Sequence, residues 1–173
     1  LPEFTASDIL SSKLWQPRAD RPPLGIDLAC TKVAVDFQNI SAGNADAVIR
    51  QSLEILREAI NTDAVFLVLL DGHGERIDSI ETAKGPFAQC RPEVLKGEPL
   101  ESLPWIRSRL EHVRLLEMRD TVQVKPEQAT DAERLAGLDI RSVLLIAFAV
   151  QGTVRGFLAF ASSNQTKLSQ PCA

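Results

Sequence analysis

The sequence predicts a single α+β domain, with one antiparallel sheet and helices on its faces. Two observations support this prediction. Segments with the apolar period of a helix alternate along the chain with segments typical of strands. The strands form two hairpins, at residues 64–82 and 142–161, which place consecutive strands antiparallel. The helices must therefore cover the faces of the sheet.

Length and composition fit one globular domain. The chain has 173 residues, 45% of them hydrophobic and 24% charged, and a chain of this size buries roughly 70% of its unfolded surface without disulfides or metals. Its 19 Lys and Arg against 23 Asp and Glu give a net charge of -4, which argues against nucleic acid as a partner. The longest apolar run, residues 143–150, is far shorter than the roughly 20 residues that cross a bilayer. We therefore expect no membrane insertion.

Three regions are expected along the chain. Residues 1–25 are rich in proline without a periodic apolar face, which is typical of a linker or disordered arm. Residues 26–165 form the single domain, and residues 166–173 a tail. The chain does not begin with methionine, so we interpret it as a processed or excised fragment.

The first half of the domain is expected to hold two helices and a hairpin. In residues 26–40 apolar positions recur at steps of four and three, as in a narrow helical stripe, although β-branched residues there also permit a strand. Residues 46–60 form a clearer amphipathic helix, with apolar residues on one face and charged residues on the other. Residues 64–70 are apolar throughout, which predicts a central strand covered on both faces. Turn residues 71–74 return the chain as a second strand over residues 75–82.

The second half begins with a long irregular connection. Residues 83–103 are rich in Gly and Pro, and connections of this length are often functional. A short helix is expected over residues 104–111, a short strand over 113–118 and another helix over 126–138. The hairpin at 142–161 closes the domain. Within it, Gly156 predicts a close backbone approach or a bulge.

The order of these elements and several short motifs resemble a GAF domain. The similarity covers residues 46–161 and is greatest to GAF domains upstream of bacterial histidine kinases and GGDEF-type diguanylate cyclases. The resemblance implies a regulatory domain attached to an output module in the same chain. It also implies a ligand pocket between one sheet face and the connection. The motifs are Asp63-Ala64, Leu103-Pro104-Trp105, Ala132-Glu133-Arg134, Ile140-Arg141-Ser142, and Gly152 followed by Gly156-Phe157.

No catalytic or metal-binding constellation is visible in the sequence. The two histidines, His73 and His112, do not form an H-x-x-x-H pair. The cysteines Cys30, Cys90 and Cys172 are odd in number and far apart, which argues against a disulfide scaffold and for the reducing cytoplasm. We therefore expect no catalytic turnover and no metal, and no cofactor is identified.

The ligand site implied by the resemblance comprises Phe87, Cys90, Trp105 and His112. Phe87 and Cys90 lie in the segment that closes over the cavity in GAF-like proteins. Trp105 either forms a cavity wall or anchors the short helix by packing, and His112 either faces the pocket or balances the negative end of that helix. Cys90 is followed by Arg91, where phytochrome-like GAF domains commonly have His after the bilin-attaching Cys. The ligand therefore stays unidentified.

Three functions are left open by the sequence. The first is a sensor that binds an unidentified small molecule and signals to an output module. The second is a ligand-free dimerisation module whose pocket is filled by its own side chains. The third is an enzyme resembling the reductases of free methionine sulfoxide, with Cys90 as nucleophile. An empty polar cavity would favour the sensor, and a collapsed apolar cavity would favour the dimerisation module. Two thiols within bridging distance would favour the enzyme.

A homodimer is expected from the first helix. If this helix does not pack on its own sheet, its apolar stripe is left exposed and available to a second copy. The stripe consists of Ile26, Cys30, Val33, Phe37 and Ile40.

Overall fold

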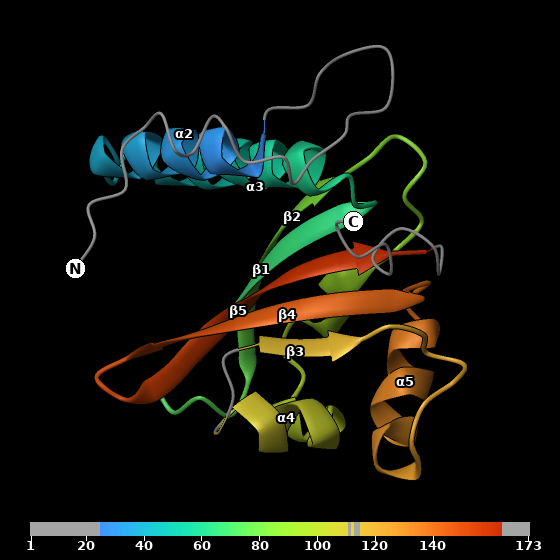
Figure 1. Cartoon of the computed structure of the whole chain (residues 1–173). Coiled ribbons are helices and arrows are strands. Elements are labelled where there is room, and N and C mark those ends of the chain that lie inside the picture. The colour runs from blue at the N-terminus through green and yellow to red at the C-terminus, as the bar shows by residue number, and fades with distance from the viewer. Residues whose placement is uncertain (1–24, 111, 113–114, 164–173) are drawn as a thin grey trace, which may run out of the picture.

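The computed structural model describes residues 25–110, 112 and 115–163. The expected arm, apart from Gly25, and the expected tail at 166–173 lie outside the described residues. At the centre is a five-stranded sheet in the order β2-β1-β5-β4-β3, with every neighbouring pair antiparallel (Figure 1). The predicted α+β class and both predicted hairpins are confirmed. The strands are β1 Ala64–Leu70, β2 Ile77–Lys84, β3 Leu115–Met118, β4 Ser142–Val150 and β5 Thr153–Ser162.

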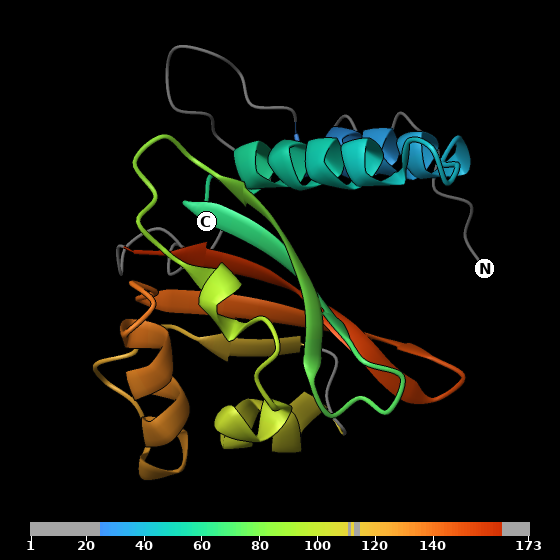
Figure 2. The same ribbon diagram turned by 180° about the vertical axis from the view of Figure 1, so that it is seen from behind.

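Helices cover both faces of this sheet. Figures 1 and 2 show α2 and α3 above it and α4 and α5 below it. The helical alternative for residues 26–40 is confirmed, and the connection after β2 contains two short 3-10 turns, Pro92–Leu95 and Leu100–Ser102. None of the described helices combines the length and apolarity needed to cross a bilayer. The α-helices are α2 Ile26–Gln38, α3 Ala45–Ile60, α4 Pro104–Leu110 and α5 Ala129–Ala136.

The strand β1 faces two separate cores, as its apolar sequence predicts. Phe66 and Val68 point to the main core, on the side of α4 and α5, while Val65 points to α3. The helix α2 lies alongside α3 above the sheet (Figures 1 and 2), and its Ala29 and Val33 pack on Ile55 and Ala59 of α3 rather than on the strands.

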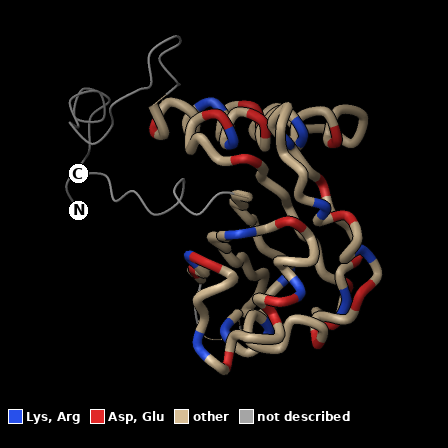
Figure 3. The backbone as a smooth tube through the Cα atoms, turned by 90° about the vertical axis from the view of Figure 1, so that its right-hand side faces the viewer, with Lys and Arg blue, Asp and Glu red and all other residues tan. Residues whose placement is uncertain are grey.

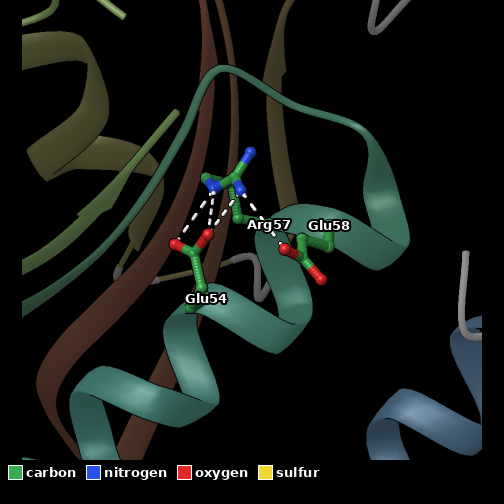
Figure 4. A network of polar contacts seen from close by, with 3 residues as sticks. All are labelled: Glu54, Arg57 and Glu58. Carbon is green, nitrogen blue, oxygen red and sulfur yellow. Dashed lines mark hydrogen bonds and ion pairs between the residues drawn. The ribbon is translucent and has the colours of Figure 1, made fainter. Parts of the chain in front are cut away.

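An ion-pair network secures the end of α3. Arg57 lies between Glu54 and Glu58, and its Nε donates to both carboxylate oxygens of Glu54 at 3.1 Å (Figure 4). The hydrogen bond that Arg57 donates to Glu54 raises the pKa of Arg57. The guanidinium also lies against Gly85, where an added Cβ would be 3.3 Å from it. The network therefore fixes α3 against the chain that leaves β2.

Gly156 marks a place where strands pack too closely for a side chain. A Cβ added there would lie 2.1 Å from the backbone oxygen of Val68 and 2.7 Å from the ring of Phe148. The register between β4 and β5 also shifts between Phe148 and Ala149. The close backbone approach predicted from this glycine is therefore confirmed.

We expect Gly156→Ala to lower the free energy of unfolding by about 1–3 kcal/mol, because the added methyl group must displace a strand and a ring. The matched control is Gly72→Ala, whose Cβ would meet nothing within 4 Å. Urea denaturation of both variants is the measurement. Equal midpoints for the two variants would contradict the close approach.

Candidate functional site

The candidate site is the lower face of the sheet, which is covered by α4, α5 and the connection at residues 85–103. The resemblance implies a ligand at this place. In the structure this space is filled by buried apolar side chains of the chain itself. They come from the connection, from both helices and from the sheet. The described residues therefore form a packed core at this place. The contributing side chains include Leu95, Leu100, Leu103, Ile106, Leu110, Leu135, Phe66, Leu145 and Phe157.

A buried carboxylate joins the two helices of this face. Asp131 of α5 has no exposed surface, and its two oxygens accept hydrogen bonds from the backbone N–H groups of Trp105 and Ile106, at 3.1 and 2.8 Å. Both N–H groups lie in the first turn of α4, where a helix offers no partner of its own. A residue of one helix thus caps the other.

The electrostatics of Asp131 combine two opposing effects. Burial raises the pKa of its carboxyl group, and the hydrogen bonds from Ile106 and Trp105 act in the opposite direction. Sequence reasoning missed this residue, because Asp131 lies 26 positions after Trp105 and no local spacing connects them.

Two of the four predicted ligand residues belong to the packed face. Cys90 is 2% exposed in the main core, and burial raises the pKa of its thiol. Trp105 packs half-buried against the same core, and its buried Nε1 has no hydrogen-bond partner among the described residues. Phe87 is 92% exposed and His112, after α4, is also exposed. A role of the four in ligand binding stays a prediction.

Among the hollows on the described part of the chain are two shallow ones of about 320 Å³ each, and none of the four predicted residues lines either of these two. One lies beside the end of β3 and contains Asp120, which pairs with Nε of Arg141 at 2.8 Å. The other lies on α4 beside the ion pair of Arg107 with Glu101. The charged groups at both hollows are therefore partnered by the fold itself.

The distribution of ionisable groups offers little chemistry. Within the described parts of the chain, His, Cys, Asp and Glu form no cluster of three or more that could hold a metal. Basic and acidic residues intermingle along the described chain (Figure 3). The free thiols of Cys30, on α2, and Cys90, in the main core, lie on opposite sides of the sheet. These two cannot form the thiol pair that the reductase hypothesis requires, and Cys172 lies outside the described residues.

Comparison with known proteins identifies the fold. No family model and no curated protein matches the sequence. The phycocyanobilin-bound GAF domain of a cyanobacterial phytochrome is 14% identical, with a TM-score of 0.66 over 85% of both chains. A phycoerythrobilin-bound GAF domain from a cyanobacterial phytochrome is 12% identical, with a TM-score of 0.62 over 83% of this chain and 84% of the other.

A third similar structure is the chromophore-binding domain of Stigmatella aurantiaca phytochrome P1. It is 12% identical, with a TM-score of 0.60 over 88% of this chain and 56% of that one. Such identities establish the fold alone. The chain thus has the GAF fold, as its sequence motifs indicated.

We expect Asp131→Ala to lower the free energy of unfolding by about 1–3 kcal/mol, because two buried N–H groups of α4 lose their acceptor. Burial raises the pKa of Asp131, so protonation of this carboxyl group is more favourable in the folded state than in the unfolded chain. The difference from wild type should therefore be largest below about pH 4 and shrink as pH rises through the raised pKa. Urea denaturation across this pH range is the measurement.

The control for this prediction is Glu133→Ala, an exposed position on the same helix. It should change the stability by less than about 0.5 kcal/mol. An Asp131→Ala protein as stable as this control would mean that the cap contributes nothing.

Proposed function

We propose that this chain is a non-catalytic regulatory domain that works through contacts between protein surfaces. The observation that supports this most is the packed face beneath α4 and α5. A chromophore-sized ligand there would have to displace several large side chains, such as Leu103, Ile106, Leu145 and Phe157. Displacing four of them costs about 6–12 kcal/mol, which is comparable to the whole binding free energy of a micromolar or nanomolar ligand.

The geometry also argues against Cys90 as a nucleophile or as an attachment point for a ligand. A nucleophilic cysteine needs a thiolate and access for its substrate. Cys90 is 2% exposed, and burial raises the pKa of its thiol. This environment supports neither sulfoxide reduction nor covalent attachment of a tetrapyrrole at Cys90.

The surface that supports regulation by contact is on α2. Ile26 and Phe37 of α2, and Ile40 just after it, are 47, 43 and 38% exposed, and α2 packs on α3 rather than on the strands. We therefore extend the proposal to a homodimer formed through the exposed residues of the stripe, since its Val33 already packs on α3. Signals would pass along α2 and α3 to an output module in the same chain. The free thiols of Cys30 and Cys90 fit placement in the reducing cytoplasm.

We expect Phe37→Glu to weaken self-association about tenfold or more, because a charge replaces an aromatic anchor at the interface. The matched control is Val35→Glu, which alters another exposed apolar residue of α2, 49% exposed, on a different side of the helix. Light scattering over a concentration series measures the mass. A wild-type chain that stays monomeric at high concentration would contradict the dimer, as would equal effects of both substitutions.

A second candidate function is the binding of a small molecule at Trp105. Two observations favour it: the buried Nε1 of Trp105 has no partner in the described part of the chain, and two proteins of the same fold hold bilins. In this alternative Phe87, Cys90 and His112 complete the site, and α4 moves to admit the ligand.

Thermal-shift screening with bilins and a small-metabolite library separates the two candidates. The main proposal predicts that no compound raises the melting temperature. A hit whose affinity falls by about 5- to 150-fold in Trp105→Ala or Phe87→Ala, equivalent to 1–3 kcal/mol, would instead favour the second candidate. Val94→Ala, an exposed position in the same connection, is the control.

A further inference from the structure

The upper face of the sheet carries continuous rows of apolar side chains. By strand register, Leu67 of β1 lies beside Leu158 of β5, Leu158 beside Ile146 of β4, and Ile146 beside Leu115 of β3. One row therefore crosses four strands with apolar residues at every position.

The neighbouring row on the same face is also apolar. By register, Leu69 lies beside Gly156 and Gly156 beside Phe148. We call the six large side chains of the two rows the open sheet face. They are Leu67, Leu69, Leu115, Ile146, Phe148 and Leu158. Two of them, Leu67 and Leu158, are partly buried against the cluster beneath α3.

The helix α3 covers only one side of this face. Next to it, Val65 and Phe160 are 0 and 2% exposed. Exposure then rises along the row toward β3, to 39% at Ile146 and 60% at Leu115. When one face of a sheet meets water, apolar and polar residues normally alternate along each strand, and the polar ones lie on the solvated face. Leu, Ile and Phe at these positions are instead typical of a face that is covered.

We propose that residues 1–24 of this chain cover the open sheet face. Their sequence concentrates five large apolar side chains between positions 4 and 15, whereas residues 164–173 contain only one large aliphatic side chain, Leu168. The prolines of this segment suggested a linker, but such a density of large apolar residues is unusual for a linker exposed to solvent. The five are Phe4, Ile9, Leu10, Leu14 and Trp15.

The point of attachment allows this contact. Residues 1–24 join the domain at Gly25, directly before α2, and α2 lies on the same side of the molecule as β4 and β3 (Figures 1 and 2). Four neighbouring strands span about 15 Å, whereas 24 residues reach up to roughly 80 Å when extended. The segment is therefore long enough to cross the face with several residues to spare.

Tethering favours this segment over a second copy. A short flexible tether holds its end at an effective concentration on the order of 1 mM. A second copy present at about 1 μM would need roughly thousandfold higher affinity to occupy the same face. The proposal is independent of the dimer, which uses the stripe on α2.

The tryptophans of the chain provide the experiment. Trp15 and Trp105 are the only two, so the emission of the full chain minus that of Trp15→Phe isolates Trp15. With an intrinsic dissociation constant of about 0.1 mM the segment is about 90% docked, so acrylamide quenching of Trp15 should be about tenfold weaker than that of a free indole. The emission should also shift to the blue.

Substitution of the face should release the segment. Ile146→Glu should restore quenching close to that of a free indole, whereas Val122→Glu, 64% exposed and outside the sheet, should not. Circular dichroism checks that both variants fold. Leu115→Glu on the edge strand replaces Ile146→Glu if that variant does not fold.

Three results would overturn the proposal. Trp15 in the wild-type chain could be quenched as strongly as a free indole. Its protection could persist in both Ile146→Glu and Leu115→Glu, which would place the segment elsewhere. Its protection could also rise with protein concentration, which would identify a second copy as the occupant. Loss of the dimer in Phe37→Glu with unchanged Trp15 quenching would leave this proposal intact.

Discussion

The buried carboxylate of Asp131 is the interaction on which the lower half of the molecule depends. The helix α4 has only seven residues, too few to be stable by itself in water. Asp131 satisfies two of its first N–H groups and ties it to α5. With α4 held there, Ile106 and Leu110 stay buried against the sheet. The cap thus determines whether this face is a core or an opening.

The same interaction opposes the binding of any ligand on this face. A ligand on this face has to compete with side chains already packed there, and its differential affinity for the opened state must exceed the cost of displacing them. The upper side of the sheet, in contrast, is only partly covered. There α2 and the β4–β3 side of the sheet leave large apolar residues in water. Surfaces of that kind are where contacts between proteins or chain segments form.

The sequence predicted what local patterns determine. Both hairpins, the four helices and the close approach at Gly156 follow from apolar period, turn residues and a glycine inside a strand. The candidate site was harder to predict from the sequence. Phe87 is apolar and lies in the expected segment, yet it points into solvent, because no periodicity constrains an irregular connection. The cap by Asp131 and the partial cover by α3 depend on how distant elements dock, which the spacing of residues along the chain does not encode.

Native-state hydrogen exchange at the amides of Trp105 and Ile106 tests most directly whether this face is a permanent core. If Asp131 holds α4 closed, both amides should exchange only on global unfolding, with the same opening free energy as the central strands β1 and β5. Exchange of these two amides at a much lower opening free energy, while β1 and β5 stay protected, would contradict the account. It would show that α4 opens by itself and that the face beneath it is an accessible pocket.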